Sequence, residues 1–217
     1  MKLEVFFFIV FICTICYSID ITKLQKIPQP MKGFQEKLIL GRWFFQFRKP
    51  PCNWPGSDQL SDFELTISNK DKKRLLFTNF ARNDGLCTMF PSNAYKGTTP
   101  GTYLVKDPLG DKFSGYMVIP ATDYKTFLVG YVCIKMSTFG DKCDDVLIAV
   151  RTRMVHPDKA VVARINFVLM HLWGITVDEL LATPNNLDTE SKKFAIAEEF
   201  MVMWVELLVI QIYSKRI

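Results

Sequence analysis

Apolar and polar residues alternate in short runs between residues 41 and 153. Successive side chains of a β-strand point to opposite faces, so this alternation indicates strands with one buried face. Turn residues such as Pro50-Pro51 and Asn83-Asp84-Gly85 separate the runs. The predicted strands are GRWFFQF, DFELTIS, RLLFTNFA, LCTMF, GTYLV, FSGYMVI, KTFLVGYVCIKM and DVLIAVRTRMV. About eight strands at this spacing are typical of a sandwich or a closed antiparallel barrel.

The period changes after His156-Pro157, where apolar residues recur at helical spacing. These residues are Val161, Val162, Ile165, Val168, Leu169 and Leu172. Gly174 is placed to end a helix, because glycine readily adopts the left-handed conformation of a C-terminal cap. We therefore expect one amphipathic helix after the strands.

The two ends of the chain have different patterns. Lys2 precedes an apolar run at residues 5–12, and small or polar residues follow it around Ser18. This run is shorter than the ~20 residues of a membrane-spanning helix, so residues 1–18 are predicted to be a signal peptide of a secreted, extracellular protein. A membrane anchor or a buried helix is the alternative. Residues 19–33 would form an N-terminal extension.

The C-terminal segment, residues 184–217, is unusually apolar, although Glu198, Glu199 and Glu206 interrupt it. A helix or late strand packed on the barrel is the simplest interpretation. The alternative is that residues 194–213 bind a membrane surface or another copy of the chain.

Charge and composition exclude some classes of function. The 27 basic and 22 acidic residues give a net charge of +5 without a basic block, so nucleic-acid binding is not predicted. His156 and His171 lack the spacing of metal ligands, and neither a metal nor a cofactor is expected. No paired acid and base or nucleophile elbow is present. The sequence therefore favours a binding protein over an enzyme.

Four cysteines remain after the predicted signal peptide: Cys52, Cys87, Cys133 and Cys143. Four cysteines in a secreted chain indicate two disulfides, for which three pairings are possible. We favour Cys133 with Cys143, because a hairpin would bring them opposite each other, and hence Cys52 with Cys87. A free Cys87 thiol would be the only candidate nucleophile.

Three short motifs occur in order: Gly41-Arg42-Trp43, Thr122-Asp123-Tyr124 and Arg151. Together with the signal peptide before them and the helix after them, they resemble the lipocalin family, in particular its apolipoprotein D-like members. The closest stretch is YMVIPATDYKTFLVGYVC, at residues 116–133. The cysteines depart from the family pattern, because none of the four that remain after the predicted signal peptide precedes Trp43 to pair with Cys133.

The resemblance implies an all-β fold in which eight antiparallel strands form an up-and-down barrel, with the barrel and its helix spanning residues 34–183. In the family, the tryptophan of the first motif closes one end of the barrel and an arginine packs across it. Trp43 would take the first role and Arg151 the second, with Arg153 as a rival. Gly41 and the Thr122-Asp123-Tyr124 turn would be structural.

A barrel of eight strands can hold one small ligand or be filled by its own side chains. If Trp43 faces inward, alternation predicts the ligand-binding residues Phe45, Phe47, Phe77, Tyr116, Val118, Phe127, Val129 and Tyr131. A wall this apolar suits a lipid, fatty acid, sterol or retinoid. The predicted function is a secreted carrier of a small hydrophobic ligand. The alternative is an extracellular interaction or matrix-associated protein that uses its rim loops or apolar C-terminal segment.

Overall fold

The computed structural model describes residues 21–51, 59–83, 86–106, 114–136 and 142–185. The predicted signal peptide, Cys52 and the segment 194–213 lie outside the described residues. Among the described helices, none combines the length and the apolar character that crossing a bilayer requires.

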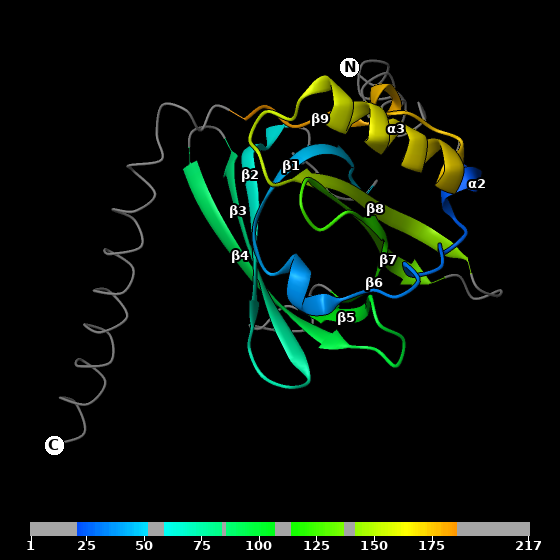
Figure 1. Ribbon diagram of the computed structural model, residues 1–217. Helices are drawn as coiled ribbons and strands as arrows, with labels where there is room; N and C mark the ends of the chain where they lie inside the picture. The colour runs from blue at the N-terminus through cyan, green and yellow to red at the C-terminus, as the bar shows by residue number, and fades with distance from the viewer. Residues whose placement is uncertain (1–20, 52–58, 84–85, 107–113, 137–141, 186–217) are drawn as a thin grey trace, which may run out of the picture. The chain divides into compact units, whose positions relative to one another are not determined.

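A single antiparallel sheet closes on itself, as predicted (Figure 1). Neighbouring strands in the chain pair with each other, and β1 pairs with both β2 and β8, which closes the barrel. The strands are β1 (Gly41–Lys49), β2 (Ser61–Asn69), β3 (Arg74–Asn83), β4 (Leu86–Lys96), β5 (Thr102–Lys106), β6 (Ser114–Thr122), β7 (Phe127–Met136) and β8 (Cys143–Thr152). The alternation of the sequence thus predicted all eight.

The predicted amphipathic helix is α3 (Lys159–Trp173), which lies along the outside of the barrel (Figure 1). The side chain of Asp158 caps its first turn by accepting a hydrogen bond from the Val161 amide. Gly174 ends it in the left-handed conformation, with φ of 66°, and donates its N–H to the Met170 carbonyl. Shorter elements are α2 (Ile21–Leu24), η1 (Glu36–Ile39), η3 (Val177–Glu179) and β9 (Leu181–Ala182).

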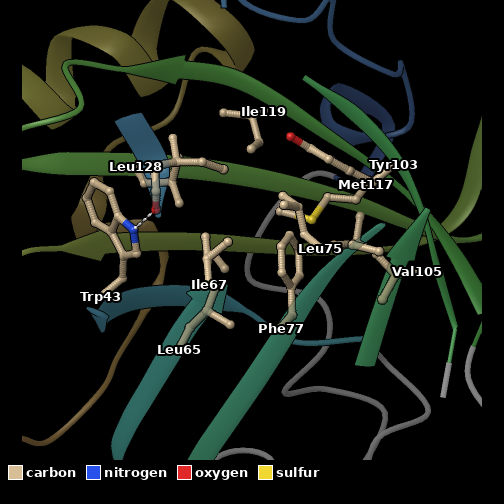
Figure 2. Packing of buried hydrophobic residues seen from close by; sticks show 14 of the residues in the cluster. Trp43, Leu65, Ile67, Leu75, Phe77, Tyr103, Val105, Met117, Ile119 and Leu128 are labelled. Carbon is tan, nitrogen blue, oxygen red and sulfur yellow. Dashed lines mark hydrogen bonds between the residues drawn. The ribbon is translucent and has the colours of Figure 1, made fainter. Parts of the chain in front are cut away.

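Buried side chains form two separate clusters. The inner core lies inside the barrel and joins residues of β1 to β8 with Phe34 and Ile39 of the N-terminal segment (Figure 2). The helix core lies between α3 and the outer faces of β7 and β8. Because α3 covers them, β7 and β8 are buried on both faces, whereas β3 and β4 expose more of their outer face.

Trp43 lies near the start of β1, at the end of the barrel that we call the base. Its side chain is fully buried and its indole N–H donates to the Ile39 carbonyl at 2.7 Å (Figure 2). The guanidinium of Arg153 lies 3.7 Å from the centre of the Trp43 ring. It also donates to the carbonyls of Leu38, Leu40 and Arg42.

The prediction that Arg151 packs on Trp43 is therefore wrong, and its rival Arg153 has this position. Arg151 still belongs to β8, so its side chain follows the alternation of the strand into the barrel. Arg153 comes directly after β8 ends at Thr152, where it can reach across the base to the segment before β1. Arg151 instead lies over Phe45, with its guanidinium carbon 4.0 Å from the ring centre.

The Thr122-Asp123-Tyr124 motif forms the turn between β6 and β7. The Asp123 carboxylate accepts hydrogen bonds from the backbone amides of Lys125, Thr126 and Phe127 and from the Thr126 hydroxyl. Burial raises the pKa of Asp123, but the hydrogen bonds from Thr126 and Phe127 outweigh it and hold this pKa below its ordinary value. Arg164 of α3 reaches the same carboxylate at 3.2 Å, which ties the helix to the turn.

The predicted disulfide between Cys133 and Cys143 is formed, and it joins β7 to the start of β8. The predicted Cys52–Cys87 bond stays a prediction, because Cys52 lies outside the described residues. Cys87 is an exposed, free thiol in β4.

A short C-terminal strap, residues 181–185, fastens the chain to β1. Its strand β9 pairs with Phe47 and Arg48. Beyond β9, the Thr183 amide donates to the Gln46 carbonyl, and the Asn185 side chain donates to the Phe45 carbonyl. The Pro184 carbonyl accepts from the Asp62 amide. The strap thus links β1 and β2 where their own pairing has ended.

Candidate ligand-binding site

The pairing register decides which side chains enter the barrel, because residues directly opposite each other on neighbouring strands share a face. Trp43 is opposite Leu65, Leu75 is opposite Ala94, and Tyr103 is opposite Met117. The pattern continues through β7 and β8, where Gly130 is opposite Ala149. The apolar inner face contains Trp43, Phe45, Leu65, Ile67, Leu75, Phe77, Ala94, Tyr103, Val105, Met117, Ile119, Leu128, Val132 and Ala149.

Two of the predicted ligand-binding residues, Phe45 and Phe77, lie in this inner core. Phe45 is stacked on Phe63, with the ring centres 3.7 Å apart. Phe77 lies against Tyr103, with the ring centres 5.9 Å apart (Figure 2). The two phenylalanines come from β1 and β3 and belong to one continuous apolar lining.

Phe47 does not enter the barrel, although it is two residues beyond Phe45. The register of β1 against β8 shifts between these two phenylalanines, so Phe45 is opposite Arg151 but Phe47 is opposite Val150. A β-bulge of this kind puts an extra residue in one strand and reverses the faces beyond it. Phe47 consequently packs against the helix core.

Three further predicted residues, Phe127, Val129 and Tyr131, belong to the helix core. They lie on the outer face of β7, under α3. The rings of Tyr131 and Trp173 are stacked, with their centres 5.9 Å apart. The Tyr131 hydroxyl donates to the Leu24 carbonyl at 2.9 Å. Burial raises the pKa of Tyr131, so the phenol remains a proton donor. The inward placement of these residues was wrong by one position, and Leu128, Gly130 and Val132 take the inner face.

Tyr116 and Val118 of β6 also face outward. They are directly opposite Cys133 and Tyr131, which both lie on the helix side of β7. Tyr116 is 36% exposed, so it is not enclosed by the barrel. The inner residues of this strand are Met117 and Ile119. The predicted pair of phenol hydroxyls is therefore absent from the interior.

The inner face instead contains a charged side chain, that of Arg151. Arg151 is directly opposite Phe45 and Leu128, two residues of the inner core, so its side chain lies on the inner face. It is only 4% exposed. Burial lowers the pKa of Arg151 to about 9, which still leaves the guanidinium charged at neutral pH. The sequence predicts Arg151 at the base, where Arg153 lies instead.

An inward phenol that the sequence analysis did not predict is that of Tyr103. Tyr103 of β5 is 1% exposed, and its hydroxyl is 3.2 Å from a carboxylate oxygen of Glu36. Lys96 pairs with the same carboxylate at 2.6 Å. Burial, together with the charge of Glu36, raises the pKa of Tyr103. The alternation within TYLV could have indicated an inward tyrosine, but η1, which brings Glu36 to it, carries no such signal.

The described residues also form a hollow on the outer surface. A surface hollow of about 440 Å³ lies at the turn between β2 and β3, lined by Asp71, Lys72, Lys73, Arg74 and Tyr95. It is open to solvent and outside the barrel. In the part of the chain that the structure describes, His, Cys, Asp and Glu side chains form no cluster that could hold a metal ion.

Neither a model of a known protein family nor a curated protein matches the sequence. Solved structures do match the fold. The cockroach allergen Per a 4 superposes with a TM-score of 0.59 at 16% sequence identity, over 77% of this chain and 99% of the allergen. Apocrustacyanin C1 gives a TM-score of 0.56 at 16% identity, over 74% of this chain and 87% of its own. Lobster apocrustacyanin A1 gives 0.54 at 18% identity, over 69% and 79% of the two chains.

These neighbours are lipocalin-fold proteins. Because their sequence identities to this chain are low, the similarity is evidence for the fold alone. The order of the strands, the closed barrel and the helix that follows agree with them. The chain therefore has the lipocalin fold.

Proposed function

We propose that the protein is a carrier of a small hydrophobic ligand held inside the barrel, and that it is a binding protein with no catalytic role. The observation that supports this most strongly is the lining of the barrel, where side chains from all eight strands form one apolar surface. Eight-stranded barrels are the size that can enclose one small ligand. The lipocalin fold of the neighbours agrees with such a role.

Binding of an apolar fluorescent probe tests the proposal. Ala81 lies in the inner core, whereas Ala160 lies exposed in the first turn of α3. Ala81→Phe should occupy part of the interior and remove most of the probe binding, and Ala160→Phe should leave it unchanged. Thermal unfolding of both variants checks that the barrel is folded. A folded wild-type protein that binds no apolar probe, and yields no lipid when extracted with organic solvent, would refute the carrier function.

We also propose that the protein is secreted. The Cys133–Cys143 disulfide is typical of oxidising compartments, and the pattern of residues 1–18 is that of a signal peptide. Expression in eukaryotic cells followed by N-terminal sequencing of protein from the medium tests this. A mature N-terminus near residue 19 is the expected result, and retention of the protein inside the cell with residue 1 intact would contradict it.

The alternative function, interaction through the apolar C-terminal segment, concerns residues 194–213. A chain that ends at Asn185 separates it from the carrier function, because it retains the barrel and the strap. If this shortened chain loses binding to liposomes or self-association but still binds the probe, both functions are present. Unchanged behaviour in both assays would exclude the segment as an interaction site.

A further inference from the structure

Arg151 is a buried cation with two guanidinium nitrogens that lack a partner among the described residues. Within the described part of the chain, neither its Nε nor its Nη1 has a hydrogen-bond partner, although both atoms are buried. Its guanidinium carbon lies over the face of Phe45, 4.0 Å from the ring centre. Burying a charge without an opposite charge is costly, so such a group points to a missing partner.

The other arginines near the interior are engaged. Arg48 of β1 is buried as well, and it donates to the Leu60 carbonyl and the Thr183 hydroxyl. Arg153 donates to three carbonyls at the base. Neither has the surroundings of Arg151, whose opposite neighbours on both sides, Phe45 and Leu128, are apolar.

The guanidinium of Arg151 occupies the space that a side chain at position 130 would otherwise fill. A Cβ atom at Gly130 would lie 2.8 Å from the Nη1 of Arg151 and 3.3 Å from the Cε of Met117. The guanidinium thus lies among β1, β6 and β7, inside the barrel. Any side chain at position 130 would have to displace it.

From Arg151 away from the base, the next inner positions of β8 are Ala149 and Leu147, which are opposite Gly130 and Val132. Arg48 of β1 is opposite Ala149, but its guanidinium donates to the Leu60 carbonyl and the Thr183 hydroxyl. A ligand with its anionic group at Arg151 would therefore place an apolar chain along the apolar positions of β7 and β8. The single charge of Arg151 matches that of a carboxylate, whereas a phosphate dianion would call for further donors.

We propose that the ligand is a hydrophobic monocarboxylate of the fatty-acid type, whose carboxylate pairs with Arg151 near the base of the barrel and whose chain lies along the inner core. This inference rests on the proposed carrier function and narrows its ligand class. Sterols, retinol and other uncharged compounds would leave the guanidinium without a partner.

Calorimetric titration with dodecanoate and with dodecan-1-ol tests the inference, because the two probes share a chain and differ in the charged group. The wild-type protein should bind dodecanoate about tenfold or more tightly than the alcohol, as expected for hydrogen bonds to a charged group. Arg151→Met should remove this preference by weakening dodecanoate binding alone. Arg151→Lys should retain part of it. Arg42→Met removes a cation from the outer surface, where Arg42 pairs with Glu64, and should keep the full preference.

The outcomes separate the two proposals. Equal affinities of the wild-type protein for both probes, or a preference that persists in Arg151→Met, would overturn the carboxylate inference while leaving the carrier function intact. A folded wild-type protein that binds neither probe would overturn both. A carbon-13 label on the dodecanoate carboxyl gives a second readout that needs no variant. Its titration midpoint should fall below that of free dodecanoate when bound, and an unchanged or raised midpoint would contradict the pairing.

Discussion

Single residues decide how the base of the barrel is closed. Trp43 is fully buried and holds the η1 segment through its indole N–H. Replacement of a large buried aromatic by alanine costs about 3–5 kcal/mol. We expect Trp43→Ala to lower the free energy of unfolding by this amount in urea denaturation. Phe167, 77% exposed on α3, provides the control, and Phe167→Ala should be nearly neutral. Similar small effects for both variants would contradict the role of Trp43.

The two arginines at the end of β8 should respond in opposite directions. Arg153→Met removes the donors to three backbone carbonyls and should cost about 2 kcal/mol. Arg151→Met removes a buried charge whose pKa burial lowers to about 9. It should stabilise the ligand-free protein by roughly 1–3 kcal/mol. Thermal and urea unfolding of delipidated protein measure both. Destabilisation by Arg151→Met in ligand-free protein would indicate that the fold itself uses this charge.

At the scale of elements, the Asp123 turn couples β6, β7 and α3. The pKa of Asp123 is below its ordinary value, so its charged form is favoured in the folded protein. Linkage gives the direction of the pH dependence. The stability that the Asp123 carboxylate contributes is present at pH values above the unfolded carboxyl pKa of ~3.9, and it is lost as the pH falls through the folded pKa. Asp123→Asn should therefore be less stable than wild type at pH 7, and the difference should shrink below pH ~4.

Urea unfolding at pH 7 and pH 3 measures this dependence. Arg164→Met is the matched control, because it removes the exposed ion pair with Asp123 and the hydrogen bond to the Thr126 hydroxyl but keeps the Asp123 carboxylate, and it should cost less than about 1 kcal/mol. A stability difference for Asp123→Asn that is the same at both pH values would show that the carboxylate charge is not what stabilises the turn.

The elements themselves could be predicted from the sequence, because alternation and helical spacing are local properties. The inner face could be predicted where the outer face is polar. In DFELTIS, for example, the apolar alternates Leu65 and Ile67 do belong to the inner core. In β7 both faces are apolar, because α3 covers the outer one, and alternation then carries no information about which residues enter the barrel.

Other features depended on contacts that no short pattern encodes. The bulge after Phe45 turns Phe47 outward, although Trp43, Phe45 and Phe47 alternate regularly in the sequence. Arg151 and Arg153 are two residues apart and chemically identical, so only the end of β8 distinguishes the inward cation from the one at the base.

For the whole molecule, the strap sets where the folded unit ends. A chain that ends at Asn185 keeps the contacts of Thr183, Pro184 and Asn185 with β1 and β2, so its stability should match that of the full chain. A chain that ends at Leu180 loses β9 and these bonds and should be less stable by about 3 kcal/mol. Urea unfolding of the two chains measures the difference. Equal stability would show that the strap is dispensable.

The pairing of β1 with β8 has a consequence for how the protein is made. Residues about a hundred positions apart must meet before either strand has its second neighbour. During synthesis, one edge of β1 therefore stays unpaired until β8 has left the ribosome. An unpaired strand edge can pair with other chains and so promotes aggregation. Ribosome-bound chains that end before β8 should accordingly need chaperones. Once Arg153 has emerged, the base can be closed and the exposed edges disappear together.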